Sequence, residues 1–276
     1  MGQGWSRESD RLVARHPLTR WRLASRRLRQ QIRERRRGPD GRVSRVALLD
    51  GSVGHPVIRE FWADDHVVSS FRTNGWTFVE DFLDPSTMKE IKRDWPSLKY
   101  FDAVRNHRRT YDEGLLATRD EVTRHLAAFP ALARLYADLF SDRLESGVSM
   151  LVGDGRIRRC LGVIASDARW GSGMSPHQDT QFPDETGVDP RVSMIICVAG
   201  YGSGQRAGAT QILSDNTFSS PIFVPDQISN SAMIFCSGLP AGAGFYHGVA
   251  PISRGCRRLA LAVGFGGLAE LGRASR

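Results

Sequence analysis

The stretch HGVAPISRGCRRLALAVGF, residues 247–265, contains the features that decide the fold. Its second half is a mainly apolar run that follows two arginines, and its first half is rich in Gly, Pro and Ser. Similar apolar runs lie upstream, separated by loops of Gly, Ser, Pro and Asp: Leu161–Ala165, Val192–Val198, Thr210–Leu213 and Ser231–Cys236. Many short strands at modest intervals are typical of a β-sandwich, a barrel or a jelly roll. The sequence therefore predicts a β core over residues 148–268.

Residues 56–147 have a different, mainly helical pattern. Asp64–Arg72 and the segment opened by Asp84-Pro85 indicate short helices, with an alternating strand at Trp76–Val79 between them. A capping box at 118–121 precedes a long apolar face that Pro130 kinks or divides. The sequence thus predicts one domain over residues 56–276, of the α+β or mainly β class, in which N-terminal helices flank the β core.

Residues 1–55 form an arginine-rich arm. Residues 1–46 hold 14 arginines and four acidic residues, a net charge of +10, so the rest of the chain carries −2 although the whole chain carries +8. Nine arginines within residues 18–37 surround an apolar stripe at helical spacing: Leu18, Trp21, Leu28 and Ile32. Such a basic amphipathic helix suits contact with a membrane surface. A solvated tail, or a helix that docks onto the domain or a second subunit, remains an alternative.

Composition excludes several classes of protein. Hydrophobic residues make up 41% and charged residues 25%, which is ordinary globular usage. No apolar run reaches the ~18 residues of a spanning helix, and no apolar stretch behind the N-terminus resembles a signal peptide. The four cysteines form no CxxC pair, which argues against structural zinc and against a disulfide scaffold. We therefore expect a protein of the reducing cytoplasm, with a peripheral membrane contact through the arm.

Two histidines and one aspartate in the β region point to a metal site. His177 and Asp179 are two residues apart, so on an extended segment both side chains project to the same face. His247, on a distant predicted strand, would complete a set of two imidazoles and one carboxylate. This facial set leaves adjacent positions open and is diagnostic of non-haem Fe(II) oxygenases. The His-X-Asp step alone is common, and an unrelated loop histidine remains the alternative.

The residues around this set resemble the Fe(II)/2-oxoglutarate-dependent oxygenases. Arg257 follows His247 by ten residues, in the Gly-X-Arg context of that superfamily. The run from Arg191 to Val198, followed by Ala207-Gly208-Ala209-Thr210, is similar to prolyl-4-hydroxylase-like members. The triplet at 177–179 and the pair His247-Gly248 resemble phytanoyl-CoA-hydroxylase-like members, as does the lead-in Phe71–Leu83. The resemblance covers residues 60–266 and leaves the arm unexplained.

The resemblance implies a fold, cofactors and residue roles. The fold is a double-stranded β-helix, a cupin-like jelly roll, and residues 56–276 are a single catalytic domain. His177, Asp179 and His247 hold Fe(II), and Arg257 binds the C5 carboxylate of 2-oxoglutarate, with Arg258 as the second choice. With O2, such an enzyme hydroxylates an unactivated C–H bond and releases succinate and CO2. Asp179 argues against halogenation, because related halogenases have a small residue at that position.

The sequence does not decide which hydroxyl group makes the second contact to 2-oxoglutarate. Leu259 stands where many members have Ser or Thr, and the tyrosine that prolyl hydroxylases place ahead of the His-X-Asp has no counterpart, Trp170 being the nearest aromatic residue. The hydroxyl candidates are Ser166, Ser193 and Thr210.

The substrate is expected to be a small molecule, such as a natural product, a sugar or a lipid-linked metabolite. Arg169, Trp170 and Arg206 hint at an anionic or sugar-like ligand. A cupin-like metal-binding or sensing protein is the main alternative. A nucleic-acid or protein demethylase that uses the basic arm is less favoured, because the domain itself has a net negative charge.

Overall fold

The computed structural model describes residues 56–105, 109–117, 126–154, 158–179, 191–201, 208–237 and 245–267. The predicted helix of the arm and the predicted capping box at 118–121 lie outside these residues. Within the described part of the chain, no helix is long and apolar enough to cross a membrane.

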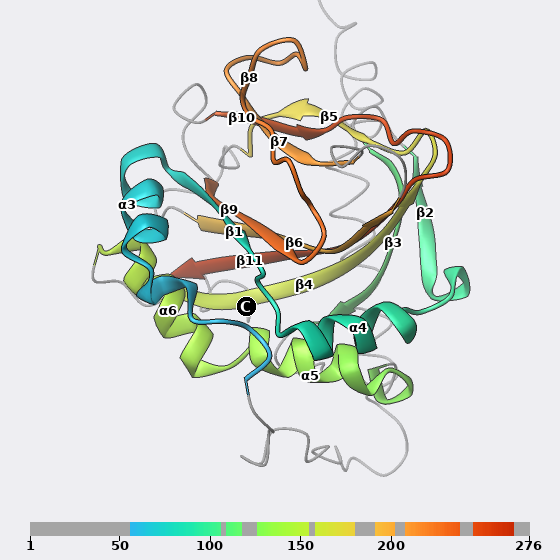
Figure 1. The fold of residues 1–276 in the computed structure, drawn as a ribbon, viewed down its shortest axis with the longest axis horizontal. Helices are drawn as coiled ribbons and strands as arrows, with labels where there is room; N and C mark the ends of the chain where they lie inside the picture. The colour runs from blue at the N-terminus through green and yellow to red at the C-terminus, as the bar shows by residue number, and fades with distance from the viewer. Residues whose placement is uncertain are drawn as a thin grey trace, which may run out of the picture. The chain divides into compact units, whose positions relative to one another are not determined.

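Two antiparallel sheets face each other. The larger has the strand order β1-β9-β6-β11-β4-β3-β2, and the smaller has the order β5-β10-β7-β8. The strands are β1 (Trp76–Glu80), β2 (Phe101–Arg105), β3 (Thr110–Ala117), β4 (Arg158–Arg169), β5 (Met174–His177), β6 (Arg191–Tyr201), β7 (Thr210–Leu213), β8 (Pro221–Phe223), β9 (Ser231–Ser237), β10 (Tyr246–Val249) and β11 (Arg257–Gly267). In Figure 1 the small sheet lies over one face of the large sheet, and α4, α5 and α6 cover the other face. This arrangement is the predicted double-stranded β-helix with N-terminal helices.

The helices begin and end at residues that the sequence marks. They are α3 (Asp65–Asn74), α4 (Pro85–Arg93), α5 (Pro130–Leu139) and α6 (Asp142–Val152), with short 3-10 turns at Phe61–Ala63, Leu98–Tyr100 and Leu126–Ala128. The Asp64 carboxylate caps α3 by accepting from the backbone N–H groups of His66 and Val67, at 2.9 and 3.3 Å. Gly75, with φ of 74°, ends that helix. Pro130 occupies the first turn of α5, so it starts that helix and does not kink a longer one.

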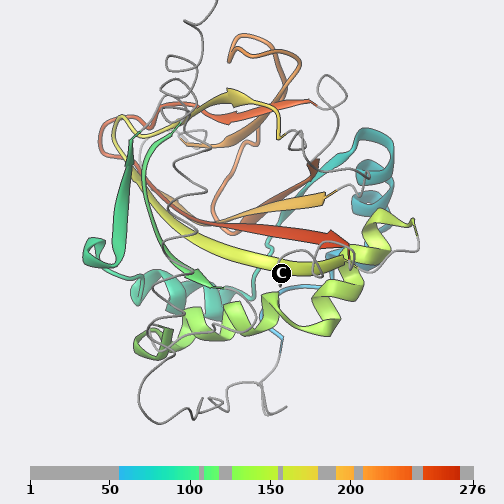
Figure 2. The same cartoon turned by 180° about the vertical axis from the view of Figure 1, so that it is seen from behind.

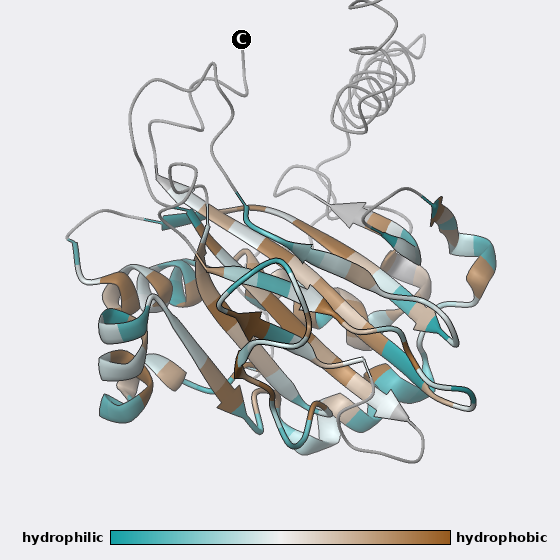
Figure 3. Cartoon of the chain, turned by 90° about the horizontal axis from the view of Figure 1, so that it is seen from above, coloured by the Kyte–Doolittle hydropathy of each residue, from teal (hydrophilic) through white to brown (hydrophobic). Residues whose placement is uncertain are grey.

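The residues of the large sheet alternate between two environments. On β11, Leu259, Val263 and Phe265 belong to the main core that the sheet shares with the helices. Arg258, Ala260 and Ala262, which alternate with them along the strand, face the space between the two sheets, where they line a pocket. Figure 3 shows hydrophobic residues running along the strands of the large sheet. The period of two along each strand therefore separates a structural face from a pocket face.

Residues 101–105 and 110–117 differ from the expectation of a mainly helical segment. They form the antiparallel pair β2–β3, which extends the large sheet beyond β4 (Figure 2). The segment contains Asp102, Asp112, Glu113 and Gly114, which are poor strand formers, so its own sequence carries little β signal. Hydrogen bonds to β4, about 50 residues further along the chain, hold it in the sheet.

Candidate metal centre and pocket

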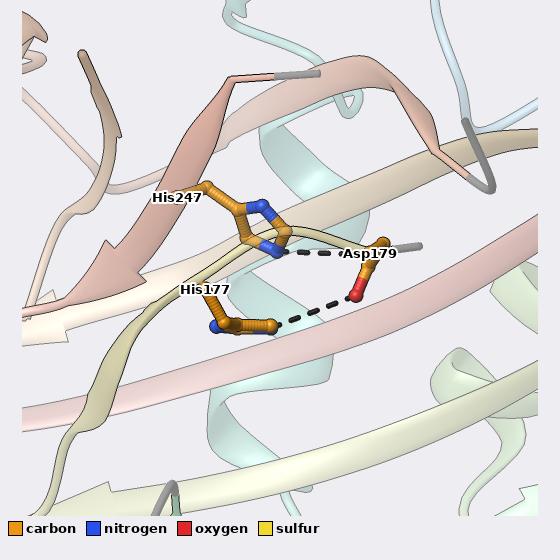
Figure 4. A group of neighbouring side chains, drawn as sticks. All are labelled: His177, Asp179 and His247. Carbon is orange, nitrogen blue, oxygen red and sulfur yellow. Dashed lines mark ion pairs between the residues drawn. The ribbon is translucent and has the colours of Figure 1, made fainter. Parts of the chain in front are cut away.

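His177, Asp179 and His247 come together between the sheets. His177 ends β5 and lies directly opposite His247 on the antiparallel strand β10. Asp179 lies between the two rings: its Oδ1 is 3.6 Å from Nε2 of His177, and its Oδ2 is 3.7 Å from Nε2 of His247. One potential ligand atom from each residue lies within 4.8 Å of the others. Figure 4 shows both rings and the carboxylate converging on one point, as the sequence predicts.

Burial and hydrogen bonding prepare the two imidazoles to act as ligands. His177 is 8% exposed and His247 is 3% exposed. Nδ1 of His177 lies 2.8 Å from the carbonyl oxygen of Ser175, so a proton on that nitrogen leaves the lone pair of Nε2 free. Burial lowers the pKa of His247 to about 4. The Asp179 carboxylate raises this pKa, whereas the neighbouring His177 and Arg109 lower it further. His247 is therefore neutral at physiological pH, which is the form that binds metals.

A pocket opens beside this cluster. Its walls come from β3, β4, β5, β6, β7, β10 and β11, and its empty volume is about 480 Å³ when the open mouth is included. Met174 of β5 and Val249 of β10 line it. These residues lie on one side of the His177–His247 pair along the strands, and Asp179 lies on the other. The pocket therefore begins beside the three potential metal ligands, at Met174 and Val249, and the Asp179 carboxylate is 41% exposed.

Arg258 brings a positive charge into this pocket. Its side chain is 7% exposed, and its Nη2 donates to Oγ1 of Thr210 at 3.1 Å. Its buried Nε has no hydrogen-bond partner among the described residues. A buried guanidinium with an unused donor beside an open pocket is suited to an anionic ligand, especially a carboxylate. The chain makes room for it at Gly208, where φ is 75° and an added Cβ would lie 3.3 Å from Cδ of Arg258.

Arg257, the first choice for the carboxylate contact, does not line the pocket. Its Nε donates to Oδ1 of Asp167 at 3.0 Å, and its Nη2 donates to Oδ2 of the same carboxylate. Asp167 is fully buried. Adjacent strand residues point to opposite faces, so only one of the two arginines can face the pocket, and the structure places Arg258 there. The structure therefore places Arg258, the second choice from the sequence, in the pocket lining, and Arg257 outside it.

The three hydroxyl candidates also differ in whether they line the pocket. Thr210 lines the pocket and accepts from Arg258. Ser166 also lines it, but its Oγ donates to the carbonyl oxygen of Ala260 at 3.2 Å. Ser193 bonds to Ser237 at 2.8 Å and is not among the lining residues. Thr210 is thus the hydroxyl placed next to the cationic group.

The sequence did not reveal the contribution of β3. Tyr111 and Glu113 line the pocket, although they precede the His-X-Asp segment by more than 60 residues. Burial raises the pKa of Tyr111, so its hydroxyl stays protonated and can donate. Trp170, the aromatic residue that the sequence offered in this role, is 69% exposed and lies outside the pocket lining. Only recognition of the β3–β4 pairing could have indicated Tyr111.

No protein-family model matches the chain, and no curated protein matches its sequence. Solved structures do match. A prolyl-4-hydroxylase from Pseudomonas putida superposes with a TM-score of 0.52 at 18% identity, over 75% of this chain and 98% of the other. A prolyl hydroxylase from Trichoplax adhaerens gives 0.56 at 14% identity, over 79% and 94%. The non-heme alpha ketoglutarate dependent epimerase SnoN gives 0.51 at 12% identity, over 74% and 82%.

The chain therefore has the double-stranded β-helix fold of the Fe(II)/2-oxoglutarate oxygenases, and it carries the His-X-Asp…His set between the sheets. At these identities the likeness establishes the fold. The chemistry has to be argued from the side chains.

Proposed function

We propose that this protein is a non-haem Fe(II)- and 2-oxoglutarate-dependent oxygenase that hydroxylates a small molecule. One observation supports this most strongly. A set of two imidazoles and one carboxylate borders a pocket that contains a buried arginine with an unused donor. Nitrogen and carboxylate ligands suit Fe(II), and the arginine suits the far carboxylate of a 2-oxo diacid.

Each residue has a distinct part in this proposal. Nε2 of His177, Nε2 of His247 and the Asp179 carboxylate would bind the metal from one side, leaving adjacent positions open. Arg258 and Thr210 would hold the C5 carboxylate, with the Tyr111 hydroxyl as a further donor in the same pocket. When bound, Fe(II) with 2-oxoglutarate supplies the activation of O2 and the hydroxylation of a C–H bond, with release of succinate and CO2.

The protein itself would bind, orient and exclude water. The Ser175 carbonyl fixes the ring of His177, and the ring of Phe235 packs against His247 with centroids 4.5 Å apart. In this proposal 2-oxoglutarate would fill the pocket at the Met174 and Val249 side, and the substrate would approach from the side of Asp179, which is 41% exposed. Since Asp179 provides the carboxylate ligand, hydroxylation is proposed in preference to halogenation.

Loss of one ligand should abolish metal binding and turnover. The test uses purified protein under anaerobic conditions, with Fe(II) and 2-oxoglutarate added and the visible charge-transfer band recorded. Asp179→Ala and His247→Ala should each lose the band, and succinate should no longer form when O2 is admitted. Asp102→Ala, which removes an exposed carboxylate of β2, is the matched control and should behave like the natural protein.

Two results would contradict the proposal. A full-strength band in Asp179→Ala and His247→Ala would remove these residues from the metal site. Metal binding by the natural protein without consumption of 2-oxoglutarate would instead support the cupin-like binding or sensing protein.

A further inference from the structure

One wall of the pocket comes from β3, which is not one of the two paired strands, β5 and β10, that carry the histidines of the metal site. Strand β3 supplies Tyr111 and Glu113 to the lining. Arg109, just before β3, pairs through its backbone with Met174 at the start of β5, three residues before His177. The β2–β3 hairpin therefore closes the pocket next to the metal cluster.

Glu113 is an unexpected residue in a pocket for a dicarboxylate. Its side chain is only 17% exposed, and it shares the lining with Arg258. A carboxylate in this position would repel the C5 carboxylate of 2-oxoglutarate, and charges that are partly buried are screened less than exposed ones. An uncompensated Glu113 would thus oppose the attraction of Arg258.

Arg109 compensates this charge. Its Nη1 lies 3.1 Å from Oε1 of Glu113, and its side chain is 34% exposed. The pKa of Arg109 is raised: burial works against the charge, but Tyr111, Glu113 and Asp179 together outweigh it. Arg109 therefore stays cationic, and the charges of Arg109 and Glu113 cancel, which leaves Arg258 to face the ligand.

We propose that Arg109 is a specificity-determining residue for the co-substrate: by neutralising Glu113, it allows the pocket to accept the C5 carboxylate of 2-oxoglutarate. This inference rests on the proposed function. It predicts that Arg109 acts through Glu113, so the effect of losing Arg109 should disappear when Glu113 is neutral.

The same hairpin provides a matched control. Arg105 and Asp112 form a second ion pair, with 3.3 Å between Nη2 and Oδ1. Asp112 is next to Glu113 in the strand and therefore projects to the opposite face. Arg105→Met removes the same charge from the same hairpin on the face away from the pocket, together with the hydrogen bond from Nη1 of Arg105 to the carbonyl oxygen of Tyr111.

The experiment measures the affinity of 2-oxoglutarate by calorimetry, with the protein saturated with Mn(II) so that no turnover occurs. Arg109→Met should weaken binding roughly tenfold or more, because an unpaired partly buried carboxylate then faces the ligand. Glu113→Gln alone should change it less than about threefold, and the double variant should return to within about threefold of the natural protein. Arg109→Lys, which keeps the charge, should bind nearly normally, as should Arg105→Met.

A second ligand tests whether the charge of Arg109 affects binding of the C5 carboxylate or binding at the metal. The monocarboxylate 2-oxovalerate has the same chain length and lacks the C5 carboxylate, so Arg109→Met should not weaken its binding. If Arg109→Met weakened both ligands equally, Arg109 would act at the metal and the inference would be wrong. It would also be overturned if the double variant bound as weakly as Arg109→Met, or if only the melting temperature changed. Failure of the natural protein to bind 2-oxoglutarate with the metal would instead refute the proposed function itself.

Discussion

The two faces of the large sheet are made from the same strands, but one packs against the helices and the other lines the pocket. The face toward the helices is apolar and closely packed, with Phe265 fully buried. The face toward the small sheet carries small and polar residues, such as Ala260, Ser166 and Arg258, around an open pocket. Because the side-chain period of a strand is two, neighbouring residues belong to different faces and have different roles. Substitutions on one face should therefore change stability, and those on the other should change ligand binding.

The largest effect on stability is expected on the helix face. Phe265→Ala removes a fully buried ring from the main core and should lower the free energy of unfolding by about 3–5 kcal/mol. Chemical denaturation checks this value. The affinity for 2-oxoglutarate of the fraction that remains folded should be unchanged, and a large loss of affinity would contradict the separation of the two faces.

Arg258→Leu tests the pocket face. In the proposed function this variant removes a charge-assisted contact to the C5 carboxylate, worth about 1.5–3 kcal/mol, so the apparent KM for 2-oxoglutarate should rise by one to two orders of magnitude. Succinate formation at varied 2-oxoglutarate concentration checks this. An unchanged KM would show that the ligand does not reach Arg258.

Arg257→Leu is the matched change one residue earlier. It removes two hydrogen bonds of the fully buried Asp167, which keeps Arg169 at 3.3 Å, so we expect a loss of stability of about 1–3 kcal/mol. The KM for 2-oxoglutarate should stay within about twofold, because Arg257 lies on the other face. If the two arginine variants exchanged phenotypes, the register of β11 in this account would be incorrect.

The smallest effect on catalysis is expected from the basic arm, which stays a prediction from sequence. A shortened chain that begins at Val46 should keep full 2-oxoglutarate turnover. It should no longer sediment with anionic vesicles at low salt, whereas the full-length protein should do so and should be released as salt rises. If the full-length protein ignored such vesicles, the membrane role of the arm would be refuted.

Much of the proposed metal site could be predicted because two of its three ligand residues lie close together in the sequence. His177 and Asp179 are two residues apart in a strand-like segment, and His247 precedes the last apolar run. Short apolar runs between turn residues likewise predicted the β core. A pattern over a few residues predicts the strands and the pair His177 and Asp179, whereas joining them to His247, 70 residues further along the chain, depended on the family resemblance.

The remaining parts of the site depend on contacts between distant segments. Arg257 and Arg258 are chemically identical neighbours, and they follow residues 250–256, which connect β10 to β11 and belong to neither strand. Counting residues from His247 therefore could not decide which arginine faces the pocket. Tyr111 and Glu113 belong to a strand that exists because it pairs with β4, so the wall of the pocket could not be predicted from its own residues.

The most direct test of this account is an anaerobic crystal structure with Fe(II) and 2-oxoglutarate bound. The account predicts one metal ion bound by His177, Asp179 and His247, with the C5 carboxylate of 2-oxoglutarate contacting Arg258 and Thr210 between the two sheets. A carboxylate bound at Arg257, or a metal ion away from these three residues, would contradict it.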